Sequence, residues 1–424
     1  MLDATLYHTL RKAQPLRKPI RLPTLVMPFI ILACVSVGSV SAFQEAHVVV
    51  SPRAARIHNA TFVFDGHNDL PYTLKKVASS SFVTMDIAKP QPSIHTDIPR
   101  LLQGNVGAQY WSVYVPAATA YRGAALLETL EQIQIVHAMI KKYPETFAAI
   151  SSYQDIVRAR RQGKIASLIG IEGGHSIEDS VGNLHRLFDL GARYMTLTHS
   201  DTLKWADSAT DDPKHQGLNA FGEEIVRQMN SLGMIVDLSH VSESTMHDAL
   251  DTTKAPIMFS HSSARSVADH VRNVPDTVLE RMPSNGGIVM VNFFSGFVDP
   301  EAAKIMSTMF DVSRELRQKY SDDDEFDAAV KRWRTANPYP RGTIYDVVDH
   351  IDHIVNIAGI DHVGIGSDFD GVSKLPVGLE DVSTYPRITQ ILLDRKYSKR
   401  DIDKIMSGNM MRVIRQVERV AARR

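Results

Sequence analysis

The sequence predicts an α/β fold, a closed (β/α)8 barrel of the TIM type with a helical insertion after strand 7. From about residue 60, short apolar runs typical of β-strands alternate with longer amphipathic patterns typical of helices. This alternation favours parallel strands with right-handed crossovers, and one barrel accounts for residues 43–424 as a single domain. An open doubly wound sheet remains the alternative. No Gly-x-Gly-x-x-Gly follows the first run, which weakens the dinucleotide-binding version of that alternative.

Composition excludes several other classes of protein. The 424 residues carry 47 Lys and Arg against 48 Asp and Glu, a formal net charge of -1, so no basic excess indicates nucleic-acid binding. A hydrophobic content of 44% with 22% charged residues is typical of a globular chain with a large core. A single cysteine excludes a disulfide scaffold and a cysteine-rich metal site. The 17 histidines are therefore the first candidates for chemistry.

Residues 1–42 have the layout of an export signal that is either cleaved or kept as an N-terminal anchor. Basic residues crowd the first half, an apolar run follows from Leu25 to about Val40, and small side chains occupy Val40-Ser41-Ala42. The run is shorter than the roughly 20 residues of a membrane span. Ile31-Leu32-Ala33-Cys34 also loosely resembles a lipoprotein processing site. We expect an exported protein, periplasmic or secreted, that meets a membrane only through this segment.

The apolar runs provide the eight strands that a (β/α)8 barrel needs. The candidate strands are Thr61–Asp65, Ala108–Val115, Ile165–Glu172, Tyr194–His199, Met234–His240, Pro256–His261, Gly287–Phe293 and His362–Asp368. The clearest helical patterns between them are Leu126–Lys142, Phe221–Leu232, Glu243–Thr252 and Ile344–Ala358. Residues 300–342 exceed what a barrel needs and are expected to form the helical insertion. Residues 398–424 are expected to form a basic amphipathic helix that packs against the barrel.

Ionisable side chains recur where the predicted strands end, which is the face at which such barrels build active sites. They are His67 and Asp69 after the first strand, Glu172, His199, His240 and His261 at strands three to six, and Asp368 at strand eight. A single histidine at a strand end is more often structural. Ionisable residues at the ends of six strands are not expected by chance, because the strand interiors are apolar. The pattern therefore predicts one shared functional site.

The residue types in this set indicate a metal centre. His67-x-Asp69 places two side chains on the same side of an extended segment. Imidazole together with carboxylate suits zinc and related divalent ions. The set exceeds the needs of one tetrahedral zinc, and a central carboxylate such as Glu172 can bridge two ions. Two metals about 3.5–4 Å apart would hold a water between them and lower its pKa towards roughly 7, which creates a hydroxide nucleophile.

Hydrolysis of an amide also needs an acid/base group and a group that orients the substrate. Asp368, in Gly366-Ser367-Asp368-Phe369-Asp370-Gly371, is the acid/base candidate, with loop capping as its alternative role. Arg272, in Arg272-Asn273-Val274-Pro275, would clamp a substrate carboxylate, or else form a surface salt bridge. Spacing alone does not decide between the two roles of Arg272.

These motifs resemble those of the membrane (renal) dipeptidase family of zinc peptidases, within the wider amidohydrolase-type barrels. The resemblance extends from about residue 60 to the C-terminus. Its matching stretches are Phe64–Pro71, Gly170–Ser176, Tyr194–His199, Val236–Ser242, Phe259–Ala264, Arg272–Pro275 and Gly364–Gly371. Each stretch alone is a modest signal, but as an ordered set they are highly specific.

The resemblance implies a role for each residue of the set. It implies two zinc ions per chain, with His67 and Asp69 on one, His240 and His261 on the other, Glu172 bridging them, His199 on the substrate carbonyl, Arg272 on the substrate carboxylate and Asp368 as acid/base. Members of the family hydrolyse dipeptides, often with a C-terminal D-residue, and some cleave β-lactams. The disulfides and C-terminal lipid anchor of vertebrate relatives do not transfer to this chain, which lacks the cysteines. The resemblance also allows a homodimer.

The leading hypothesis is an exported dinuclear zinc dipeptidase that hydrolyses the amide bond of dipeptides by a metal-bridged hydroxide. One alternative keeps the metal site but acts on another small amide, lactam or ester. The other alternative is a barrel that binds metal without catalysis. Because none of the proposed ligands is missing from the sequence and Asp368 is present, the sequence favours an enzyme.

Overall fold

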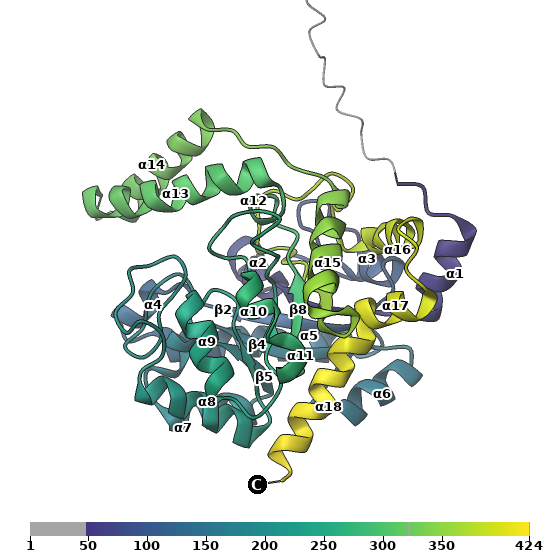
Figure 1. Ribbon diagram of the computed structural model, residues 1–424, viewed down its shortest axis with the longest axis horizontal. Coiled ribbons are helices and arrows are strands. Elements are labelled where there is room, and N and C mark those ends of the chain that lie inside the picture. Colours follow the sequence, from purple (N-terminus) through teal and green to yellow (C-terminus); the bar gives the residue numbers. More distant parts are fainter. Residues whose placement is uncertain (1–47, 321, 424) are drawn as a thin grey trace, which may run out of the picture. The chain divides into compact units, whose positions relative to one another are not determined.

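The computed structural model describes residues 48–320 and 322–423, and its centre is one parallel β-sheet (Figure 1). The strands are β1 (Val63–Asn68), β2 (Val106–Tyr114), β3 (Phe147–Ala149), β4 (Ile165–Glu172), β5 (Ala192–Thr196), β6 (Ile235–Asp237), β7 (Met258–Phe259), β8 (Ile288–Val291) and β9 (Val363–Ile365). Their order is β2-β1-β9-β8-β7-β6-β5-β4-β3, and β2 also pairs with β4. That pairing closes an eight-stranded barrel, so the predicted barrel is confirmed.

The eight barrel strands coincide with the eight predicted runs, and β3 is an addition that the sequence did not indicate. β3 pairs with Ile165–Ser167 at the start of β4, while β5 pairs with β4 from Ile169 onward. β3 therefore lies outside the ring. It pairs with the first part of the same β4 edge that pairs with β5 from Ile169 onward.

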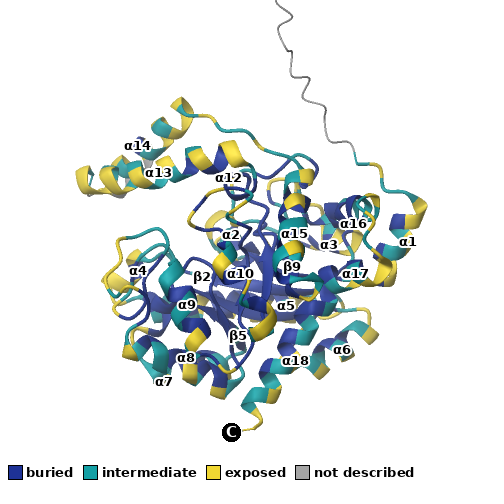
Figure 2. Ribbon diagram, viewed as in Figure 1, coloured by how far each residue is buried: buried dark blue, intermediate teal, exposed yellow. Residues whose placement is uncertain are grey.

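The barrel strands are rich in apolar residues because both of their faces are covered. In β4, Ile165, Ile169 and Ile171 pack towards the surrounding helices, whereas Ala166 and Leu168 belong to a second cluster with Tyr110 and Tyr194 inside the barrel. Figure 2 shows the barrel strands almost entirely buried and the outer faces of the helices exposed.

Helices surround the barrel, and several match their predicted bounds. They are α1 (Pro52–Ala60), α2 (Leu70–Ala78), α3 (Ile98–Gln103), α4 (Ala118–Tyr121), α5 (Ala125–Lys142), α6 (Tyr153–Arg161), α7 (Val181–Asp189), α8 (Ala220–Leu232), α9 (Glu243–Thr252), α10 (Asp276–Leu279), α11 (Met282–Asn285), α12 (Ser295–Val298), α13 (Pro300–Lys319), α14 (Asp323–Ala336), α15 (Ile344–Ala358), α16 (Tyr385–Asp394), α17 (Lys399–Asp403) and α18 (Asn409–Ala421). α9 and α15 have the predicted bounds. α8 begins where the Asn219 side chain accepts hydrogen bonds from Phe221 N and Gly222 N, and it ends at Gly233 in the left-handed conformation.

The insertion after β8, the seventh predicted strand, is helical as expected. It begins with α12 and continues into a hairpin of two helices, α13 and α14, which stands beyond the body of the barrel (Figure 1). Phe294 and Phe297 from α12 and its N-cap pack with Met306 and Met309 of α13 in a separate apolar cluster. This cluster holds the base of the hairpin on the barrel.

The C-terminal segment packs against the barrel, as predicted, but it is not one regular helix. α17 passes into a π-helical turn at Lys404–Gly408 before α18 begins. Met410, Val413, Ile414 and Val417 of α18 join the apolar cluster inside the barrel. α18 therefore covers the end of the barrel at which the strands begin.

The predicted export signal, residues 1–42, lies outside the described residues. Within the part of the chain that the structure describes, no helix combines the length and the hydropathy needed to cross a bilayer.

Candidate metal centre

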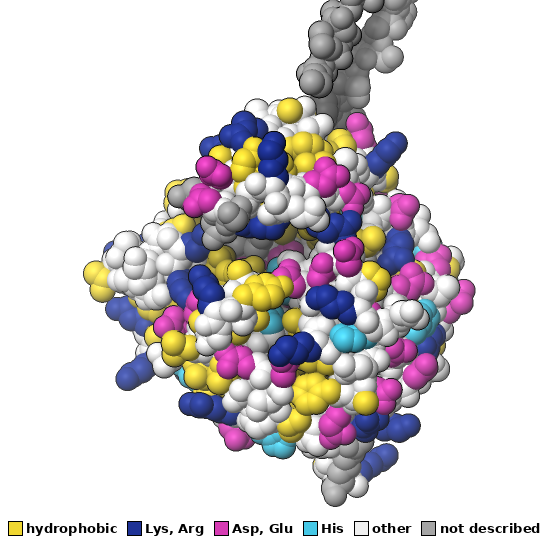
Figure 3. All heavy atoms as spheres, turned by 90° about the vertical axis from the view of Figure 1, so that its left-hand side faces the viewer, with side chains coloured by type: hydrophobic (Ala, Val, Ile, Leu, Met, Phe, Trp, Pro, Cys, Tyr) yellow, Lys and Arg dark blue, Asp and Glu magenta, His cyan; other side chains and the backbone are white. Residues whose placement is uncertain are grey.

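The ends of the barrel strands bring all the predicted site residues together. A cavity of about 420 Å³ opens at this face, lined by Asp69, Glu172, His199, His240, His261, Arg272 and Asp368. His67, in β1, lies directly beneath the cavity with no exposed surface. Figure 3 shows the surface hollowed below the α13–α14 hairpin, with charged side chains of both signs around the rim.

Glu172, the last residue of β4, is the centre of the cluster, and its two carboxylate oxygens face different histidines. Oε2 lies 3.5 Å from His67 Nε2. Oε1 lies 3.0 Å from His240 Nε2, 3.5 Å from His261 Nε2 and 3.6 Å from His199 Nε2. Glu172 is only 5% exposed, so a buried carboxylate stands between two groups of imidazoles.

His67 is oriented by one ring nitrogen and presents the other to the centre. Its Nδ1 lies 2.8 Å from the Tyr194 hydroxyl. Its Nε2 lies 3.1 Å from Asp69 Oδ2, yet within the described residues this buried nitrogen has no hydrogen-bond partner of acceptable geometry. His67 Nε2 and Asp69 Oδ2 therefore lie close together without a hydrogen bond, as expected of two atoms that bind the same cation.

His240 and His261 form a second pair. Their Nε2 atoms lie 2.9 Å apart. His261 Nδ1 lies 2.7 Å from Ser260 Oγ, which donates a 2.7 Å hydrogen bond to Asp237 Oδ2. A hydroxyl that donates to Asp237 accepts from Nδ1–H, which leaves the lone pair of His261 on Nε2. His240 has φ 73°, a left-handed conformation that is rare outside glycine and typical of functional positions.

These atoms form groups that could hold a metal ion. Three overlapping groups, each with ligand atoms within 4.8 Å of one another, are His67-Glu172-His261, Glu172-His199-His240 and His67-Asp69-Asp368. Imidazole nitrogens and carboxylate oxygens form a donor set that suits zinc and similar divalent ions. The unpartnered His67 Nε2 supports this interpretation, because a network of hydrogen bonds alone would leave that buried atom unsatisfied.

Asp368 lies beyond β9 at the edge of this cluster. Its Oδ2 accepts a 2.8 Å hydrogen bond from Asn292 Nδ2, and its backbone N–H donates to His67 O at 3.1 Å. Burial raises the pKa of the Asp368 carboxyl well above its ordinary value, and the charges of Asp69 and Glu172 raise this pKa further. The loop-capping role considered for Asp368 is taken by Asp370, whose Oδ1 accepts from His95 N at 2.7 Å.

Arg272 is a buried cation with few partners. It is 3% exposed, and its Nη1 donates one long hydrogen bond, 3.4 Å, to Ser262 Oγ. Among residues 48–320 and 322–423 it forms no ion pair, and its burial is incompatible with the surface salt bridge that spacing also allowed. Burial lowers the pKa of Arg272 to about 10, which still leaves the guanidinium charged at neutral pH.

His199 occupies the cavity side of Glu172. Its Nδ1 lies 2.7 Å from Ser200 Oγ, and its ring lies 4.7 Å from Tyr114 and 4.3 Å from His240, measured between ring centroids. Burial lowers the pKa of His199 to about 4, so its imidazole is neutral at physiological pH.

Sequence reasoning missed residues that surround the predicted site residues, namely Tyr194, Asp237, Asn292 and Gly371. A side chain at Gly371 would collide with the carboxylates of Asp69 and Asp368, so only glycine lets the loop approach both. The dipeptides Val291-Asn292 and Val236-Asp237, each a polar residue ending an apolar run, are the signal that two of these residues offered.

A family model described as "Membrane dipeptidase (Peptidase family M19)" matches residues 51–424. The chain belongs to the membrane dipeptidase family, peptidase family M19. The resemblance drawn from the strand-end motifs is thereby confirmed. The match spans the whole barrel, the α13–α14 hairpin and α18, so each of the predicted site residues lies within the matched region.

Individual relatives agree with membership of the membrane dipeptidase family. Dipeptidase tcpJ of Claviceps purpurea (strain 20.1) is 39% identical over 368 residues, which cover 84% of this chain and 77% of that protein. The probable dipeptidase PvdM of Pseudomonas aeruginosa has a similar crystal structure, with TM-score 0.75 and 23% identity over 88% of this chain and 100% of that chain. A metallopeptidase of Rhodobacter sphaeroides, solved with a phosphinate mimic of L-Ala-D-Ala, gives TM-score 0.69 and 21% identity over 84% of this chain and 99% of that chain. Both structures share the fold.

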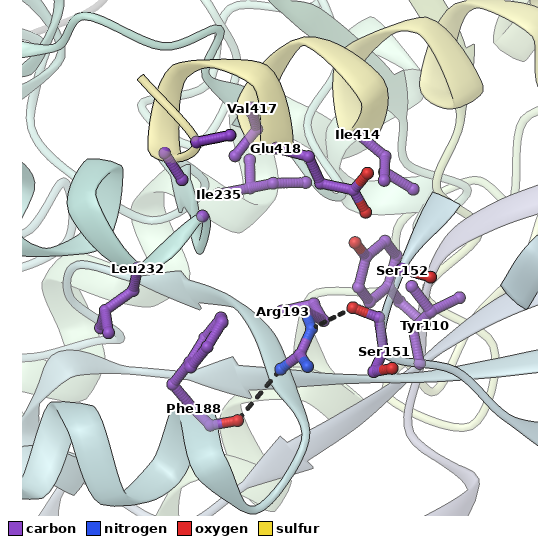
Figure 4. Close-up of a pocket in the computed structure, with 14 residues that line it drawn as sticks. Tyr110, Ser151, Ser152, Phe188, Arg193, Leu232, Ile235, Ile414, Val417 and Glu418 are labelled. Atoms are coloured by element: carbon purple, nitrogen blue, oxygen red, sulfur yellow. Dashed lines mark hydrogen bonds between the residues drawn. The ribbon is translucent and has the colours of Figure 1, made fainter. Parts of the chain in front are cut away.

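A second cavity, of about 390 Å³, lies at the opposite end of the barrel beneath α18 (Figure 4). None of the predicted site residues lines it. Arg193, on its wall, donates hydrogen bonds to the backbone carbonyls of Ser151, Phe188 and Ala192. These contacts give Arg193 a structural role where the strands begin, the end that stabilises such barrels.

Proposed function

We propose that this member of the membrane dipeptidase family is a dinuclear zinc dipeptidase. The observation that carries the proposal is the position of Glu172, whose Oε1 and Oε2 face separate sets of histidines. His67 and Asp69 would bind one zinc, His240 and His261 would bind the other, and Glu172 would bridge them. This division agrees with the close pairing of His67 with Asp69 and of His240 with His261.

Two zinc ions would supply Lewis acidity that activates the attacking water and polarises the scissile carbonyl. Asp368 would accept the proton of the water and pass it to the leaving amine. Because Asn292 occupies Oδ2, the free Oδ1 of Asp368 is the atom that would carry this proton. The raised pKa of Asp368 suits a group that must hold a proton before the amine leaves. His199, neutral and at the cavity surface, would contact the carbonyl oxygen of the substrate.

Arg272 would bind the C-terminal carboxylate of the dipeptide. Its buried guanidinium has no anionic partner within the described residues, and it lines the same cavity as the zinc ligands. A carboxylate from the substrate would supply the bidentate partner that this side chain lacks. Dipeptides with a C-terminal D-residue belong to the proposed substrates, since a metallopeptidase of the same fold was solved with a mimic of L-Ala-D-Ala.

Export is the remaining part of the proposal. Residues 1–42 carry the charge and hydropathy pattern of an export signal, and residues 43–424 would be the mature domain. N-terminal sequencing of the protein recovered from outside the cytoplasm would give a start near residue 43. Recovery of the intact chain from the cytoplasm alone would contradict export.

The decisive experiment measures zinc content and activity on the same preparation. We expect two zinc ions per chain by elemental analysis and hydrolysis of members of an L,L and L,D dipeptide panel. A preparation that holds two zinc ions and cleaves no dipeptide would contradict the proposal. A larger kcat/KM on a β-lactam or a simple ester than on any dipeptide would indicate instead an amidohydrolase of different specificity.

A further inference from the structure

The two sides of the active-site cavity differ in chemistry. Near the first strand, α2 and β2 supply polar or charged side chains, which are Asp69, Tyr72, Thr73, Lys76 and Tyr114. On the other side, the insertion supplies a wall that is apolar except for the Arg334 side chain, and its apolar residues are Phe294, Phe297, Met306, Met309 and Phe310. A substrate in this cavity therefore meets a polar surface at one end and an apolar surface at the other.

The apolar wall is a packed part of the fold. Phe294, Phe297, Met306 and Met309 form one buried cluster, with Phe310 against it. Met306 packs so closely on α12 that a side chain at Gly296 would collide with it. Met309 Sδ also lies 3.1 Å from Arg334 Nε of α14, which ties the two helices of the hairpin together beside the cavity.

The apolar wall is continuous with Arg272. The Phe297 ring centroid lies 5.3 Å from the Arg272 guanidinium carbon. The His270 ring lies 4.6 Å from Phe297 and 5.4 Å from Phe310, and His270 Nδ1 accepts a 3.1 Å hydrogen bond from Arg272 N. The wall and the guanidinium therefore lie at the same end of the cavity.

We propose that the α12–α13 wall selects dipeptides whose C-terminal residue has a large apolar side chain. The inference rests on the proposed function, in which Arg272 holds the C-terminal carboxylate. That carboxylate and the C-terminal side chain branch from the same carbon atom. Anchoring the carboxylate on Arg272 thus brings the side chain against Phe297, Met309 and Phe310. The two methionines are flexible and polarizable, so the wall accommodates apolar side chains of several shapes.

The test compares Ala-Leu, Leu-Ala and Ala-Ala on the zinc-loaded, full-length protein. We expect kcat/KM for Ala-Leu to exceed that for Ala-Ala about tenfold or more, because the extra methylene groups enter an apolar pocket. Leu-Ala gains less, because its large side chain lies on the other residue. Equal kcat/KM values for Ala-Leu and Ala-Ala, or a preference for Leu-Ala, would overturn the inference while leaving the dipeptidase proposal intact. Failure to cleave these three or any other member of the L,L and L,D panel would remove both proposals.

Variants in α13 test whether the apolar wall causes the preference for a large apolar C-terminal side chain. Combining Met309→Ala with Phe310→Ala should reduce the Ala-Leu to Ala-Ala ratio towards one, with the loss concentrated on Ala-Leu. Leu316→Ala is the matched control, since it shortens an apolar side chain on the same helix that does not line the cavity. Zinc content and residual Ala-Ala hydrolysis report whether the double variant is folded. An unchanged ratio in a folded double variant contradicts the inference, as does the same fall in the ratio for Leu316→Ala.

Discussion

Asp368 lies in the left-handed region of backbone conformation, with φ 63°, and this turn directs its carboxyl towards Asp69 and His67. The conformation is held on both sides, because the backbone N–H of Asp368 donates to His67 O and its Oδ2 accepts from Asn292. Such a strained and fully supported residue is typical of a functional position.

Replacing Asp368 with Asn keeps the shape of the side chain but removes its ability to carry a proton. We expect kcat to fall by about 10²- to 10⁴-fold, the usual contribution of a positioned acid/base group, with little change in zinc content. Steady-state kinetics with elemental analysis would measure both. A variant that retains wild-type kcat would show that another group transfers the proton.

For Arg272→Ala we expect a loss that depends on the substrate. Dipeptides with a free C-terminal carboxylate should lose about 10- to 100-fold in kcat/KM, in line with loss of charged hydrogen bonds. The corresponding dipeptide amides, which lack the anion, are the control and should change little. A similar loss on both would indicate that Arg272 only supports the local structure.

Tyr194→Phe removes a single hydroxyl, the one that lies 2.8 Å from His67 Nδ1. We expect zinc affinity to fall by about 10- to 100-fold, because the outer partner of a metal-binding histidine fixes its orientation. Tyr110→Phe is a matched control, since the Tyr110 ring lies 4.8 Å from that of Tyr194 but its hydroxyl has no hydrogen-bond partner in the described part of the chain. Competition with a chelator would measure both affinities, and equal losses would contradict the assignment.

At the scale of single residues, the sequence indicated the side chains that meet in the candidate metal centre and not those that surround them. His67 and Glu172 stand out because each interrupts or ends an apolar run. Tyr194 does not, because an aromatic residue in a strand is ordinarily a core residue. Its contact with His67 joins positions 127 apart in sequence, and only the closed barrel brings them together.

At the scale of elements, several predicted strands reach further along the chain at the site face than the observed ones, although β1 extends past its predicted end. The run Met234–His240 contains β6, which spans only Ile235–Asp237. Beyond Asp237, Leu238 and Ser239 remain buried, but the backbone leaves the sheet and turns at His240 to direct its ring towards Glu172. The predicted strand is too long because hydropathy indicates which residues are buried, and burial continues past the residue at which strand pairing ends. β3 escaped prediction for the converse reason, because its short span has only Phe147 buried.

α18 offers a test of what closes the other end of the barrel. Met410 is 1% exposed within the inner apolar cluster, so Met410→Ala should lower the free energy of unfolding by about 2–5 kcal/mol. Met411→Ala, the same change at a half-buried neighbour, should cost less. Urea denaturation would compare the two variants. If both lose the same amount, α18 does not pack as described.

At the scale of the whole molecule, the barrel gathers ionisable groups from six strands into one buried cluster. Such a cluster is costly to hold without a counter-ion, because several carboxylates and imidazoles lie buried close to one another. The fold and the metal are therefore expected to be thermodynamically linked.

Removal of zinc should lower the thermal midpoint of unfolding, and readdition should restore it. Zinc present at about 1,000 times its Kd contributes about 4 kcal/mol per ion to the folded state. Calorimetry of the chelated and the reloaded protein would measure the shift, and calcium serves as the control ion because it prefers an all-oxygen site. Identical midpoints for the two preparations would contradict the prediction and show that zinc binding does not stabilise the fold.

The α13–α14 hairpin leaves the barrel after β8 and returns to it before α15, without taking part in the sheet. It can therefore be lengthened, shortened or exchanged without altering the order of the strands or the ligands at their ends. Selection acting on this one connection can change which substrates are accepted while the reaction itself is inherited intact. Diversification within the family would then be concentrated here, with drift in the hairpin proceeding independently of constraint on the metal ligands.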